Sequence, residues 1–170
     1  MLFRSDPQRA LQQVETIRAG LSQADPGCAE TYRRNAEAFS RQLRALDAEI
    51  AGQLRPYRQR TFVTYHDVAP YFAERYGLRA AYLVASPERR PAAADLQRLA
   101  QVVRRNRLRA LLGEPRGDNR SLQSLARDLG VSVGVFDPIE TSGGQGADDP
   151  ATYGQVMRRN VTNLREAFGG

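Results

Sequence analysis

The chain contains one histidine, His66, which stands beside an aspartate at the end of a predicted strand. Two further acidic residues, Glu114 and Asp137, also follow predicted strands, and a proline comes after each of them. In an open parallel sheet, ligands bind beyond the carboxyl ends of the strands. An imidazole and two carboxylates at these ends suit zinc or a neighbouring transition metal, and the same groups could serve instead as a general acid and base.

Each of these residues also has a purely structural interpretation. His66 and Asp67 could cap the helix predicted to follow them, because aspartate is a favoured N-cap residue. Asp137 and its proline could form only the turn after a strand, and Glu114 could begin a solvated loop. We favour a ligand site because three such residues are expected at one edge of the sheet.

The elements that would position these residues follow residue 60, where short apolar runs alternate with helical patterns. This alternation predicts an α/β fold with a four-stranded parallel sheet flanked by helices. The predicted strands cover residues 61–65, 80–85, 109–113 and 131–136. The predicted helices cover residues 67–76, 91–106, 119–129 and 153–168. Residues 141–150 are rich in Gly and Asp and are expected to form a loop.

Two helices are predicted before the sheet. Asp6 and Pro7 form an N-cap followed by proline at the first helical position. A second apolar pattern, with spacings of three and four, predicts one long helix over residues 29–54, about 39 Å in length. Such a helix is longer than packing on a small sheet requires, so we divide the chain into a helical part with a long connecting helix (residues 1–55) and an α/β lobe (residues 56–170).

Composition narrows the class of protein. The chain has 170 residues, 41% hydrophobic and 26% charged, which suits one folded domain or one lobe of a larger protein. No apolar run is long enough for a transmembrane helix, and the first ten residues do not resemble a secretory leader. One cysteine, Cys28, excludes an internal disulfide, and one histidine excludes a self-contained Cys/His zinc module.

The net charge of +6 comes entirely from arginine, since the sequence has no lysine. The arginines are spread over the whole chain beside acidic residues, without the aromatic and glycine interleaving of an RNA-binding surface, so we expect no nucleic-acid partner. The sequence also lacks a glycine-rich phosphate loop and a nucleophile elbow.

Several motifs, in order, carry a resemblance to a known family. They are FVTYHDVAPYFAERYGL, PERRPAAADLQRL, LLGEPRGDNRSLQSLARDLGV, GVFDP and YGQVMRRNVTNL. Together they resemble the metal-specific solute-binding proteins of bacterial ABC transporters, the zinc and manganese group. The resemblance covers nearly the whole chain.

This resemblance implies a function and a set of site residues. Proteins of this family have two lobes joined by a long rigid helix, hold the metal between the lobes, and deliver it to a membrane permease without catalysis. His66 and Asp137 match the third and fourth of the four metal ligands, and a histidine at the position of His66 favours Zn²⁺ over Mn²⁺. Glu114 and Asp67 are expected beside the metal and not as its ligands. The family implies a periplasmic or extracytoplasmic location, with no insertion of this chain into the membrane.

The chain also departs from the family pattern. Leu2 stands where a ligand histidine is expected, Arg4 stands where a tryptophan is expected, and the amino-terminal lobe is missing. With two of four ligands, the isolated chain is expected to bind metal weakly or not at all. We therefore interpret the chain as a carboxyl-terminal lobe. The alternatives are a degenerate, metal-free interaction or chaperone-like module, and an Arg-rich anion-binding domain or small enzyme that uses His66 and Glu114.

Overall fold

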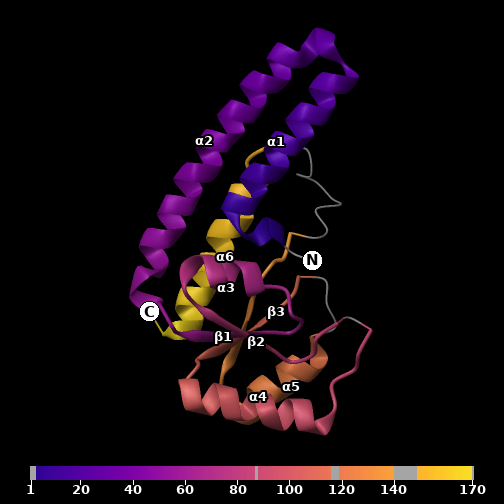
Figure 1. Cartoon of the computed structure of the whole chain (residues 1–170). Coiled ribbons are helices and arrows are strands. Elements are labelled where there is room, and N and C mark those ends of the chain that lie inside the picture. Colours follow the sequence, from indigo (N-terminus) through magenta and orange to yellow (C-terminus); the bar gives the residue numbers. More distant parts are fainter. Residues whose placement is uncertain (1–2, 87, 116–118, 140–148, 170) are drawn as a thin grey trace.

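The strands all run in the same direction and form one sheet. The computed structural model describes residues 3–86, 88–115, 119–139 and 149–169 (Figure 1). Within these residues the strands are β1 (Thr61–Thr64), β2 (Arg79–Tyr82), β3 (Ala110–Gly113) and β4 (Ser132–Val135). They pair in parallel in the order β2-β1-β3-β4. This topology confirms the predicted α/β fold with a four-stranded parallel sheet.

Helices cover both faces of this sheet (Figure 1). They are α3 (Pro70–Tyr76), α4 (Ala93–Asn106), α5 (Arg120–Leu129) and α6 (Thr152–Phe168). Phe62 and Leu112 belong to a core cluster with α3, α6 and the end of α2 (Ala29–Leu54), whereas Val63 and Leu111 belong to a second cluster with α4 and α5. Adjacent strand residues point to opposite faces, so each strand contributes to both clusters.

Two long helices, α1 (Pro7–Ala24) and α2, form an antiparallel hairpin that extends from one side of the sheet (Figure 1). Asp6 caps α1, because its Oδ1 accepts a hydrogen bond of 2.9 Å from the backbone N–H of Gln8. The bounds of α2 confirm the predicted long helix. Three short 3₁₀ turns flank these helices: Phe3–Ser5, Pro26–Cys28 and Arg55–Tyr57. Among the described residues, no helix combines the length and the apolar composition needed to cross a bilayer.

A buried carboxylate joins the hairpin to the lobe. Asp47 of α2 accepts hydrogen bonds from Gln8 of α1 at 2.7 Å, from Nε of Arg75 at 2.9 Å and from the Tyr76 hydroxyl at 3.1 Å. Burial alone would raise the pKa of Asp47, but the hydrogen bonds from Arg75 and Gln8 outweigh it and hold the pKa below its ordinary value. Three helices are therefore connected through one side chain that is 7% exposed.

Two predicted boundaries are wrong. The helix predicted to start at residue 67 begins at Pro70, with Ala69 as its N-cap. A proline disfavours helical backbone angles at the residue before it, so the helix starts after Ala69. Asp67 therefore does not cap α3. The strand predicted over residues 80–85 ends at Tyr82, where the N–H groups of Leu83 and Val84 both bond the carbonyl of Tyr65. The other predicted strand and helix bounds match the structure or differ by at most two residues, and most of the predicted loop 141–150 lies outside the described residues.

Candidate functional site

The carboxyl ends of three adjacent strands carry the residues singled out from the sequence. His66 follows β1, Glu114 follows β3, and Asp137 follows β4. Since β3 lies between β1 and β4, Glu114 occupies the central position of this edge. The edge also lies at the amino-terminal ends of α3 and α5, as expected for a parallel sheet.

His66 and Glu114 are in direct contact. Nδ1 of His66 lies 2.8 Å from Oε1 of Glu114, and the same oxygen accepts the backbone N–H of His66 at 3.2 Å. Both side chains are largely buried, at 11% and 13% exposure. An ionised carboxylate can only accept, so Nδ1 is the donor, and a ring with one proton then has its lone pair on Nε2. This is the arrangement by which a carboxylate orients a metal-binding histidine.

The backbone around His66 is held on both sides. Its carbonyl accepts the Thr64 hydroxyl at 2.6 Å and the Val68 N–H at 2.9 Å. The ring of Tyr65 meets the imidazole edge-on, with the ring centroids 4.6 Å apart. These contacts restrict the positions open to the imidazole.

Glu114 is positioned by an asparagine that the sequence analysis did not single out. Asn119, the N-cap residue of α5, accepts the Glu114 N–H at 3.2 Å and donates to the Glu114 carbonyl at 2.7 Å. A Cβ at Gly113 would lie 2.7 Å from Oδ1 of Asn119, so glycine is required for this close approach. An asparagine at the start of a predicted helix was the signal available in the sequence.

Asp137 is held by a second asparagine, Asn160 of α6. The Asn160 side chain accepts the Asp137 N–H at 2.8 Å and donates to the Asp137 carbonyl at 2.8 Å. Asn160 is 1% exposed, so both bonds are shielded from water. One carboxylate oxygen of Asp137 accepts the N–H of Ile139 at 2.8 Å, which closes a tight turn. The spacing of residues along the sequence does not indicate that Asp137 contacts a residue of the last helix.

Among the described residues, the side chains of Asp67 and Asp137 are not bonded to the His66–Glu114 pair. Within the described ranges, neither aspartate forms a hydrogen bond or ion pair with His66 or Glu114, and Asp67 is exposed. Partial desolvation raises the pKa of Asp67. In the same part of the chain, no group of three or more His, Cys, Asp or Glu residues is arranged to hold a metal. The structure thus brings together two of the four predicted site residues.

Two further charged residues lie near this edge. Glu88 follows β2, and a hydrogen bond from Ser86 lowers its pKa. Arg4 lies beside the Asp137 turn, because its Nε donates to the carbonyl of Pro138 at 3.3 Å and its own carbonyl accepts the Tyr153 hydroxyl at 2.8 Å. Leu2, the other residue that departs from the family pattern, lies outside the described residues.

Comparison with known proteins identifies relatives over almost the whole chain. The family model described as "ZnuA: Zinc-uptake complex component A periplasmic" matches residues 5–167. The high-affinity zinc uptake system protein ZnuA of Brucella abortus (strain 2308) is 30% identical over 167 residues, which are 98% of this chain and 49% of that protein. The zinc-binding lipoprotein AdcA of Streptococcus pneumoniae (TIGR4) is 32% identical over 161 residues, 94% of this chain and 32% of that protein.

Solved structures agree with this match. A crystal structure of ZnuA superposes with a TM-score of 0.84 at 25% identity, covering 96% of this chain and 58% of that chain. The laminin-binding protein Lbp of Streptococcus pyogenes superposes with a TM-score of 0.86 at 26% identity, covering 96% of this chain and 63% of that chain. The chain spans about half the length, or less, of the curated relatives it matches.

Proposed function

Because the chain belongs to the ZnuA family of periplasmic zinc-uptake components, we propose that it acts as the carboxyl-terminal lobe of a solute-binding protein that carries zinc to the permease of an ABC importer. In this proposal residues 1–55 supply the connecting helices and residues 56–170 the metal-binding lobe. The protein works outside the cytoplasm, binds and releases its cargo, and catalyses no reaction.

The contact between Nδ1 of His66 and Glu114 carries this proposal. It leaves Nε2 of a neutral imidazole as a ligand for Zn²⁺, at a zinc–nitrogen distance of about 2.0–2.1 Å when bound. Asp137 supplies the second ligand through its carboxylate. Glu114 orients the imidazole, and Asp67 adds negative charge near the cation. The imidazole of His66 favours Zn²⁺, and Mn²⁺ binds more weakly.

Two protein ligands make an incomplete site. A closed zinc site has four ligands, so this chain alone binds zinc weakly and leaves coordination positions for water or for ligands from the rest of a longer protein. Arg4 also places a guanidinium beside the turn that carries Asp137, which opposes the entry of a dication.

The test is a zinc titration of the chain by calorimetry, with NMR of the imidazole nitrogens followed in parallel at about pH 7.5. Because His66 is the only histidine, its two ring nitrogens give one unambiguous set of signals. We expect zinc to shift the Nε2 signal much more than the Nδ1 signal.

Variants identify the ligands. His66→Ala is expected to abolish binding and Asp137→Asn to weaken it, whereas the exposed Asp128→Asn is a matched control that leaves binding unchanged. Zinc binding that persists in His66→Ala, or an imidazole that does not respond to zinc, would refute the proposed ligand role.

A metal-free interaction module is the second candidate function. The observation that favours it is Arg4, whose guanidinium hydrogen-bonds the residue next to Asp137. In that case Arg4→Gln leaves the imidazole signals insensitive to zinc. In the proposed function the same substitution strengthens zinc binding, because it removes a positive charge from the site.

A further inference from the structure

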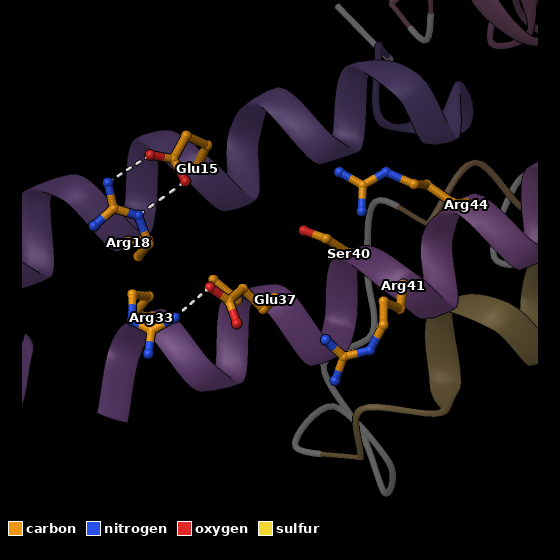
Figure 2. Close-up of a pocket in the computed structure, with 8 residues that line it drawn as sticks. Glu15, Arg18, Arg33, Glu37, Ser40, Arg41 and Arg44 are labelled. Carbon is orange, nitrogen blue, oxygen red and sulfur yellow. Dashed lines mark hydrogen bonds and ion pairs between the residues drawn. The ribbon is translucent and has the colours of Figure 1, made fainter. Parts of the chain in front are cut away.

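A polar groove lies between α1 and α2, on the hairpin and not on the sheet edge (Figure 2). Its volume is about 480 Å³. Four arginines, two glutamates, one serine and one alanine line it: Glu15, Arg18, Arg33, Ala36, Glu37, Ser40, Arg41 and Arg44. The lining therefore carries more positive than negative charge.

The glutamates of the groove already have cationic partners. Glu15 accepts both Nε of Arg18, at 2.8 Å, and a terminal nitrogen of the same guanidinium. Glu37 accepts Arg33 at 2.6 Å (Figure 2), and Arg33 is paired on its other side with Glu30. These pairs neutralise one end of the groove.

The other end has donors without acceptors. Within the described residues, Ser40, Arg41 and Arg44 form no side-chain hydrogen bond or ion pair, and they line the groove from consecutive turns of α2 (Figure 2). Like charges three residues apart on a helix repel each other, and no carboxylate of the described residues forms an ion pair with Arg41 or Arg44. A ligand that fits here must accept hydrogen bonds and carry negative charge.

We propose that this groove binds a phosphate-type oxyanion, held by the guanidiniums of Arg41 and Arg44 and by the hydroxyl of Ser40. Guanidinium presents paired N–H donors that match the oxygens of phosphate. A ligand with several linked phosphates carries more negative charge and more acceptor oxygens than a single phosphate, so it can engage Arg41 and Arg44 together. This site does not depend on the proposed zinc function, since it shares no residue with the sheet edge.

The test is calorimetric titration of the whole chain, without zinc, by inorganic triphosphate and by inorganic phosphate. A salt concentration of about 0.15 M screens attraction by the net charge of the protein. We expect triphosphate to bind more tightly than phosphate. The double variant Arg41→Gln/Arg44→Gln should weaken triphosphate binding by about tenfold or more, and Ser40→Ala by about threefold.

A matched control distinguishes binding at this groove from nonspecific attraction by the positive charge of the protein. Arg34→Gln/Arg105→Gln removes the same charge from exposed arginines outside the groove and should change affinity by less than about twofold. Circular dichroism checks that each variant keeps its helices. Equal losses in the two double variants, no binding of triphosphate, or tighter binding of an acidic peptide than of triphosphate would each overturn the proposal.

Discussion

Nδ1 of His66 and Oε1 of Glu114 lie 2.8 Å apart although 48 residues separate them in the chain. The contact depends on the sheet order, because β3 pairs directly with β1 and so places Glu114 beside the end of the strand before His66. A histidine held in this way has one defined tautomer and one nitrogen open to a ligand.

Removing the charge of Glu114 should weaken zinc binding without removing a ligand. Glu114→Gln keeps the size of the side chain but no longer fixes the proton on Nδ1, and loss of such an orienting carboxylate costs about 10–100-fold in metal affinity in known sites. Zinc calorimetry measures the loss, and the exposed Glu74→Gln serves as the control. An unchanged affinity in Glu114→Gln would show that the carboxylate does not orient the ligand.

Two asparagines of α6 provide a matched comparison of stability. Asn160 forms two shielded hydrogen bonds with the backbone of Asp137, whereas Asn163 donates one exposed bond of 2.7 Å to the carbonyl of Val135. Asn160→Ala leaves buried backbone groups unpaired and should lower the free energy of unfolding by about 2–3 kcal/mol, against about 0.5–1 kcal/mol for Asn163→Ala. Urea denaturation compares the two, and equal losses would contradict a clamp at Asn160.

The ion-pair network of Asp47 should make stability depend on pH. Its pKa is lowered in the folded protein, so its contribution is present above the unfolded value of about 3.9 and is lost as the pH falls through the folded pKa. Asp47→Asn should destabilise the protein by about 1–3 kcal/mol at pH 7 and flatten the fall in stability below about pH 4.

The measurement is urea denaturation between pH 7 and pH 3 for the wild type, Asp47→Asn and the exposed control Asp128→Asn. The control should follow the wild type. If Asp47→Asn shows the same acid-dependent fall as the wild type, the network does not supply this pH dependence.

The helices and strands followed from patterns that are local in the sequence. Spacings of three and four, with a proline after the last turn, correctly predicted α2 as Ala29–Leu54. The start of α3 was predicted wrongly because aspartate at 67 offers a good cap, whereas the restriction imposed by Pro70 on the preceding residue decides the boundary.

The contacts of the candidate site were less predictable, because they join segments that are distant in the sequence. Strand ends indicated His66, Glu114 and Asp137, but only the strand order shows which two of them touch. Asn160 reaches Asp137 from the last helix, and nothing in the local pattern around either residue indicates this pair. The ligand roles of His66 and Asp137 stay predictions.

Two glycine substitutions should have opposite effects on stability. A Cβ at Gly113 would lie 2.7 Å from Oδ1 of Asn119, so Gly113→Ala displaces the side chain that holds the Glu114 backbone and should cost about 1–3 kcal/mol. Gly52 lies within α2 with nothing within 4 Å of its Cβ position, so Gly52→Ala should stabilise the protein by about 0.5–1 kcal/mol. Thermal unfolding of both variants gives the signs directly. Because the Gly113 effect acts through Asn119, Gly113→Ala should also weaken zinc binding, whereas Gly52→Ala should leave it unchanged. A Gly113→Ala protein with wild-type stability would show that Asn119 can move without cost.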